Sequence, residues 1–287
     1  MIALWLVVTL VAVATIYTAT RLVSVNTPLL MRQYGLRTGK LEVLPARVGL
    51  AVFVLYVALD IIVMLLPGLE TAITQIRPLL GILLIVVSAV LCVQLFRGRR
   101  LKLLAGVVVA AVIGAWWVWP NWLTVSLYAM VVVFAVVSFA MWEGMNFRTA
   151  MVLLGLFVLT DMPVWLIGVT SMQESQALLG QAHPWPIFWL VPSNWQLDMH
   201  HAFSLGTGAV AFPACVIVAA GLSAYTNSGN WLVLRVGLVS YALGLLGAVA
   251  MTELVGVEMP FSLIISLVVV AGIAVAAHVD EQLLREL

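Results

Sequence analysis

Long apolar runs separated by short polar turns make up most of the sequence. A membrane-spanning helix needs about 20 mostly apolar residues, and nine runs approach or reach that length. The breaks between them carry turn residues such as Pro67-Gly68 and Pro120-Asn121. The pattern predicts an all-α, polytopic membrane protein with about nine transmembrane helices. The predicted spans are residues 2–20, 48–66, 78–96, 103–119, 122–141, 149–170, 201–222, 231–250 and 260–278.

Composition excludes several protein classes. Of the 287 residues, 64% are hydrophobic and 9% are charged, against about 25% charged in an average soluble domain. The mean hydropathy is +1.17. These values exclude a soluble globular protein and a disordered chain, and the net charge of +1 gives no field to attract nucleic acid. The two cysteines, Cys92 and Cys215, lie inside apolar runs and suggest neither a disulfide framework nor a zinc site.

The distribution of basic residues predicts the orientation. With the N-terminus outside, 12 of the 13 Lys and Arg residues fall on the inner side, as the positive-inside rule requires. Only Arg77 is then outside, and the C-terminus is inside. The first span has no basic residues before it, so we expect a retained helix, although a signal peptide is the alternative.

Two outer segments have unusual composition. Tryptophans at the turn between spans four and five, Trp116, Trp117, Trp119 and Trp122, are typical of an interfacial aromatic belt. The segment 171–200 is the longest outer stretch, and its apolar part, Pro186–Pro192, is too short to span. We expect that part to lie along the interface or to dip back into the protein.

Two acids lie within predicted spans, Asp60 in span two and Asp161 in span six. An ionisable group at bilayer depth is costly, and therefore each acid is a candidate functional group. The alternative is an acid that bonds a neighbouring helix. Pro163 follows Asp161 and removes a backbone donor, which opens the helix locally, as in helices that line a cavity.

Span seven combines Gly206, Gly208 and Pro213 in the stretch Ser204–Pro213. Glycines at this spacing allow another backbone to approach closely, either a substrate or an ordinary packing partner. Asp198, His200 and His201 precede this span. Adjacent histidines on a helix point about 100° apart, so they make a poor metal site, and we expect no metal.

The order of features over residues 116–222 resembles the presenilin and signal peptide peptidase family of intramembrane aspartyl proteases. That family has nine spans, a catalytic Asp in span six, a second in a GxGD motif of span seven, and a PAL motif that opens span nine. In this chain Asp161 stands at the first catalytic position. Gly206-Thr207-Gly208 matches the GxG, and Pro260 falls at the proline of PAL.

The resemblance implies a function and a division of the chain. Residues 1–141 would form a five-helix scaffold, and residues 142–287 the four-helix catalytic half of one integral membrane unit in a prokaryotic cell membrane. The partners would be transmembrane-helix substrates in the lipid bilayer, with no soluble cofactor. Gly206, Thr207, Gly208 and Pro260 would hold an unwound, strand-like substrate.

The departures from the family pattern concern the chemistry itself. Ala209 occupies the position of the second catalytic Asp, Thr160 stands where Tyr is usual, and the Ala-Leu of PAL is absent. The dyad needs two carboxyls that share one proton. A single Asp161 at low dielectric is expected to be protonated and cannot perform both roles. We therefore expect this chain to be proteolytically inactive or nearly so.

Two questions stay open at the level of sequence. Ala209 is either an engineered substitution or a mark of a natural relative that binds transmembrane helices without cutting them. The competing class is non-enzymatic: a transporter or a structural subunit of a membrane complex. Asp60 and Asp161 would then be buried polar or proton-relay groups, and the partners would be neighbouring membrane subunits.

Overall fold

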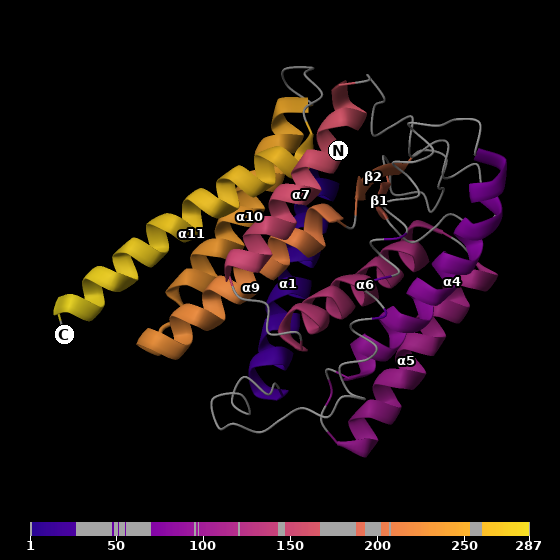
Figure 1. The fold of residues 1–287 in the computed structure, drawn as a ribbon, viewed down its shortest axis with the longest axis horizontal. Helices are drawn as coiled ribbons and strands as arrows, with labels where there is room; N and C mark the ends of the chain where they lie inside the picture. The colour runs from indigo at the N-terminus through magenta and orange to yellow at the C-terminus, as the bar shows by residue number, and fades with distance from the viewer. Residues whose placement is uncertain are drawn as a thin grey trace.

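The computed structural model describes residues 2–26, 48, 51, 55, 70–94, 96, 98–119, 121–142, 147–166, 188–192, 202–206, 208–252 and 260–286. These residues form eight helices and one two-stranded sheet (Figure 1). The helices are α1 (Ile2–Asn26), α4 (Glu70–Gln94), α5 (Arg99–Val118), α6 (Trp122–Trp142), α7 (Phe147–Leu166), α9 (Gly208–Ser228), α10 (Leu232–Ala250) and α11 (Phe261–Glu286). The strands are β1 (Phe188–Pro192) and β2 (Ala202–Gly206).

The helices confirm the all-α prediction and the membrane class. Within the described ranges, five helices contain stretches long and apolar enough to cross a membrane: Trp5–Leu22, Arg99–Val118, Gly208–Tyr225, Leu232–Ala250 and Phe261–Glu281. Such helices indicate a multi-pass integral membrane protein. Eight of the nine predicted spans overlap these eight helices, while the remaining span, 48–66, falls almost entirely outside the described residues.

The predicted start of span seven at residue 201 is wrong. Residues 202–206 form strand β2, and helix α9 begins only at Gly208. β2 pairs antiparallel with β1, with Phe188 opposite Gly206 and Pro192 opposite Ala202. Part of the segment 171–200 therefore contributes a strand to a hairpin, and that strand packs against α6 and α1.

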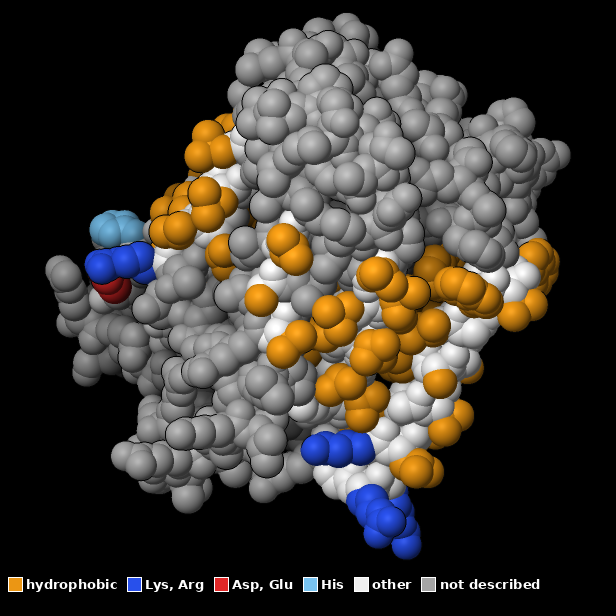
Figure 2. Space-filling view, turned by 45° about the vertical axis from the view of Figure 1, so that its right-hand side comes forward, with side chains coloured by type: hydrophobic (Ala, Val, Ile, Leu, Met, Phe, Trp, Pro, Cys, Tyr) orange, Lys and Arg blue, Asp and Glu red, His pale blue; other side chains and the backbone are white. Residues whose placement is uncertain are grey.

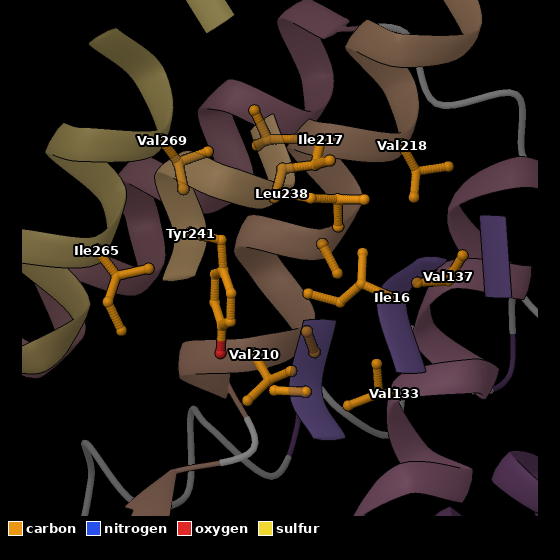
Figure 3. Close-up of a cluster of buried hydrophobic side chains, with 14 of the residues drawn as sticks. Ile16, Val133, Val137, Val210, Ile217, Val218, Leu238, Tyr241, Ile265 and Val269 are labelled. Carbon is orange, nitrogen blue, oxygen red and sulfur yellow. The ribbon is translucent and has the colours of Figure 1, made fainter. Parts of the chain in front are cut away.

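Helix α9 occupies the centre of one half of the molecule. It packs against α1, α6, α7, α10 and α11, and α10 and α11 run beside it in Figure 1. Its buried side chains Ile217 and Val218 meet Leu238 and Tyr241 of α10 and Ile16 of α1 in one apolar cluster (Figure 3). Helices α4 and α5 lie on the other side of α6 and pack against it.

Glycines set the close approach of α10 to α9 and to α11. A Cβ on Gly221 of α9 would lie 2.9 Å from the Cβ of Leu234, and one on Gly237 would lie 3.1 Å from Ile217. On the other side, a Cβ on Gly244 would lie 3.0 Å from the Cα of Ile265 in α11. Small residues at helix contacts let backbones pack closely, which drives helix association in membranes.

The turn between α5 and α6 contains the cap of α6 and tryptophans of the predicted aromatic belt, one of which is not exposed. Asn121 caps α6, because its Oδ1 accepts hydrogen bonds from the backbone N–H groups of Leu123 at 2.9 Å and Thr124 at 3.0 Å. Trp117 and Trp119 are exposed, as a belt requires. Trp116 is not: it is buried and stacks on Tyr128 at 5.4 Å, so it belongs to the core.

The surface separates apolar and basic side chains. Exposed apolar residues run along the helices, most densely on α5 (Leu101, Leu103, Leu104, Val107, Val108 and Val118), and Figure 2 shows them as a broad band with Lys and Arg at its margin. The described basic side chains are Arg21, Arg99, Arg100, Lys102, Arg148 and Arg235. They sit at the ends of α1, α5, α7 and α10 that lie away from the β1–β2 hairpin (Figure 1).

Candidate functional site

The hairpin leads directly into the first turn of α9. Gly206 ends β2, and Gly208 begins α9 two residues later. β1 packs against α6 and α1, which anchors the hairpin to the helical body. Within the described residues the sheet has two strands, so each strand keeps one edge without a strand partner. Such an edge can pair with another extended backbone.

Gly208 lies directly against Phe157 of helix α7. A Cβ added at Gly208 would come within 2.6 Å of Phe157 Cε2 and 2.9 Å of its Cζ. The ring also stacks on Phe212, one turn further along α9, at 4.8 Å between centroids and 21° between planes. The sequence predicted that another backbone could approach this glycine, and the group that approaches Gly208 in the structure is the side-chain ring of Phe157 in α7.

Asp161 lies on α7, four residues after Phe157. Residues four apart on a helix lie on the same face, one turn above each other. The backbone therefore puts the Asp161 position on the α7 face that carries Phe157, one turn towards the C-terminal end. The side chains of Asp161, Thr160 and Pro163 lie outside what the structure describes.

Ala209 is buried, with 4% of its surface exposed. It follows Gly208, which faces α7, and precedes Val210, which lies beside Tyr241 of α10 in Figure 3. Because successive residues of a helix are rotated by about 100°, Ala209 points between these two directions. Cys215, seven residues after Gly208 and therefore on nearly the same face of α9, meets α6, where its Sγ lies 4.0 Å from the carbonyl oxygen of Val136.

Pro213 affects residue 209 through the backbone. It lies inside α9 and has no N–H, so it cannot donate to the carbonyl four residues earlier. That carbonyl belongs to Ala209. The first turn of α9 therefore lacks one of its usual hydrogen bonds at Ala209, the residue that occupies the position of the second catalytic Asp in the resemblance.

Pro260 is buried immediately before α11. Its carbonyl accepts hydrogen bonds from the N–H groups of Leu263 at 3.1 Å and Ile264 at 3.5 Å, which starts the helix. The next residue, Phe261, meets the edge of Trp5 in α1 at 5.9 Å. α11 packs against both α7 and α9, so three of the predicted site positions, Asp161, Ala209 and Pro260, belong to mutually contacting helices or their ends.

Other predicted residues fall outside the described part of the chain. These are Asp60, Thr207, Asp198, His200 and His201. In the ranges that the structure does describe, no three His, Cys, Asp or Glu side chains could hold one metal ion. Both cysteines are buried and free.

Two features of this region were missed at the sequence level. The first is the hairpin, although Phe188–Pro192 is a short apolar run with prolines on both sides, which is a strand signal. The second is Tyr241, a polar group in the middle of an apolar span. Comparisons of the chain with models of known protein families, with curated proteins and with solved structures found no match.

Proposed function

We propose that this chain is a membrane protein of the presenilin and signal peptide peptidase type that binds transmembrane helices. With Ala209 at the second catalytic position, it would hold such helices without cutting them. The proposal includes nine spans, with the N-terminus outside. The basic side chains at the helix ends remote from the hairpin support that orientation.

The contact between Gly208 and Phe157 carries the proposal. It fixes the first turn of α9 against α7, one turn from Asp161. The next residue along α9 is Ala209, which is buried beside this contact. A carboxylate at position 209 would thus lie close to the turn of α7 that bears Asp161, as an aspartyl dyad requires.

The hairpin supports a substrate held as a strand. A helical peptide bond is protected, because its carbonyl is hydrogen-bonded within the helix, so a substrate helix must unwind before it is cut. At membrane depth every freed backbone group needs a new partner. The edges of β1 and β2 that have no strand partner among the described residues can supply those partners by strand addition, next to the start of α9.

The chemistry of the dyad explains why the chain is expected to be inactive. Two nearby carboxyls share one proton because both cannot ionise cheaply. The ionised one takes a proton from water as the water attacks, and the protonated one polarises the scissile carbonyl. The methyl group of Ala209 can do neither. Asp161 alone supplies one carboxyl, which leaves the water without its second partner.

Restoring the carboxylate tests this function. Ala209→Asp, reconstituted in lipid vesicles with a panel of single-span helices, is expected to cleave at least one of them, while the parent chain binds the same helix without cleavage. Ala209→Asn and the double variant Ala209→Asp/Asp161→Asn are matched controls and should not cleave. A folded Ala209→Asp variant that cleaves no helix, together with a parent chain that binds none, would overturn the proposal in favour of a transporter or complex subunit.

A further inference from the structure

Tyr241 has a buried hydroxyl with no hydrogen-bond partner among the described residues. It lies in the middle of α10, and its exposed surface is 0%. Buried tyrosines usually bond their hydroxyl, because an unpaired polar group in an apolar interior is costly. A tyrosine in this position calls for a partner, and the described residues supply none.

The hydroxyl points towards the first turn of α9. In Figure 3 the ring of Tyr241 is directed at Val210, and both residues belong to the same buried cluster. The register between α9 and α10 agrees with this direction of the hydroxyl. Gly221 meets Leu234 and Gly237 meets Ile217, so the helices run antiparallel and Tyr241 lies one turn further towards the start of α9.

The side chain of residue 209 faces the same junction. Gly208 faces α7 and Val210 faces α10. Position 209, about 100° from each of its neighbours, is directed to the space between α7 and α10, which α11 closes because it packs against α7, α9 and α10.

We propose that Tyr241 is a positioning residue of the aspartyl dyad, whose hydroxyl donates a hydrogen bond to a carboxylate at position 209. The inference rests on the proposed function. Ala209 offers no acceptor, in agreement with a hydroxyl that has no partner among the described residues. The bond would favour the ionised form of the carboxyl at 209. That carboxyl would take the proton from water, and Asp161 would be the protonated partner that polarises the scissile carbonyl.

Few ionisable groups belong to the described parts of the helices around this junction. The sequence of α7 includes Asp161, and that of α10 includes Tyr241. Residues 261–277 of α11 carry no titratable side chain. The remaining described groups on α7 and α10, Arg148 and Arg235, lie near the opposite ends of those helices. A change in pH dependence on altering Tyr241 would therefore report on the dyad.

The test is a cycle of four proteins that combines Ala209→Asp with Tyr241→Phe. In the parent background, Tyr241→Phe removes an unpaired hydroxyl, so the unfolding equilibrium in detergent should stay unchanged or shift towards the folded state. In the Ala209→Asp background the same change should shift that equilibrium about tenfold towards the unfolded state, because a hydrogen bond to a charged group is lost. An equal effect in both backgrounds would overturn the inference.

Two further variants keep this test decisive. Tyr128→Phe removes another buried hydroxyl, from a tyrosine of α6 that stacks on Trp116 of α5, and should act equally in both backgrounds. Ala209→Asn offers Tyr241 an amide oxygen as acceptor without adding a charge. In that background Tyr241→Phe should show a coupling of the same sign and about half the size, because a hydrogen bond to a neutral acceptor is weaker. Absence of coupling in a folded Ala209→Asn variant would also overturn the inference.

Proteolysis supplies a readout that a purely structural role would not change. In the Ala209→Asp background, Tyr241→Phe should lower kcat/KM about tenfold and move the acid limb of its pH profile about one unit upwards, since ionisation at 209 loses a donor. Stability coupling without cleavage would support the Tyr241 bond and count against the proposed protease chemistry. Cleavage with unchanged stability and pH profile would overturn the Tyr241 inference alone.

Discussion

Gly208→Ala should destabilise the protein, although alanine normally favours a helix. The new Cβ would lie 2.6 Å from Phe157 Cε2, inside van der Waals contact. The ring cannot easily move away, because it stacks on Phe212 with 4.8 Å between the ring centroids. Overpacking of this kind costs about 1–3 kcal/mol. Any gain from helix propensity is small at the first residue of α9.

The matched control is Gly155→Ala, two residues before Phe157 on the same helix. No described atom lies within 4 Å of the Cβ that it would add, so it should stabilise α7 by up to about 1 kcal/mol. Phe157→Leu combined with Gly208→Ala should recover part of the loss, since the ring is removed. The assay is reversible unfolding in mixed detergent micelles, followed by circular dichroism.

A comparison of Gly208→Ala with Gly155→Ala can refute this prediction. If Gly208→Ala is as stable as Gly155→Ala, the first turn of α9 does not press on Phe157. The position of residue 209 beside α7 would then lose its support, and with it the geometric basis of the dyad.

Two further sets of substitutions test the contacts that α11 makes with α10 and with α9. Gly272→Ala should cost about 1–3 kcal/mol, because its Cβ would collide with Ser240, and Ser240→Ala in the same chain should restore stability. The control Gly247→Ala, which places its Cβ in open space among the described atoms, should not destabilise the protein in the same unfolding assay. Equal losses of stability in both glycine variants would refute the contact. Ser228→Ala should cost about 1–3 kcal/mol, because its hydroxyl lies 2.8 Å from Oδ2 of the buried Asp280 and links α9 to α11. Asp280→Asn keeps an acceptor and should cost less, and a Ser228→Ala variant as stable as the parent chain would show that this bond does not contribute.

Hydropathy was sufficient to predict most of the helices. A run of apolar residues at membrane depth must satisfy its backbone internally, and a helix does so within one segment. That argument is local, so α5 and α6 appear within a few residues of their predicted limits. It fails at residues 202–206, where an apolar stretch finds its hydrogen-bond partners in β1 instead.

The site was only partly predictable. Asp161 and the Gly206–Gly208 motif stand out because acids and paired glycines are unusual in apolar spans. Their mutual placement depends on helix register, which apolar side chains encode weakly. Nothing local to Gly208 indicates that its neighbour is Phe157, and nothing local to Tyr241 indicates that its hydroxyl points to α9. These contacts join helices that are distant in the sequence.

The most direct test of the central claim is the distance from the Asp161 carboxyl carbon to the Cβ of residue 209, measured by electron cryo-microscopy of the protein in lipid. The account predicts a separation of roughly 4–7 Å, at which a carboxylate at 209 shares a proton with Asp161. A separation above about 12 Å, or side chains directed to different sides of α9, would contradict it, because side-chain motion alone could not then form a dyad.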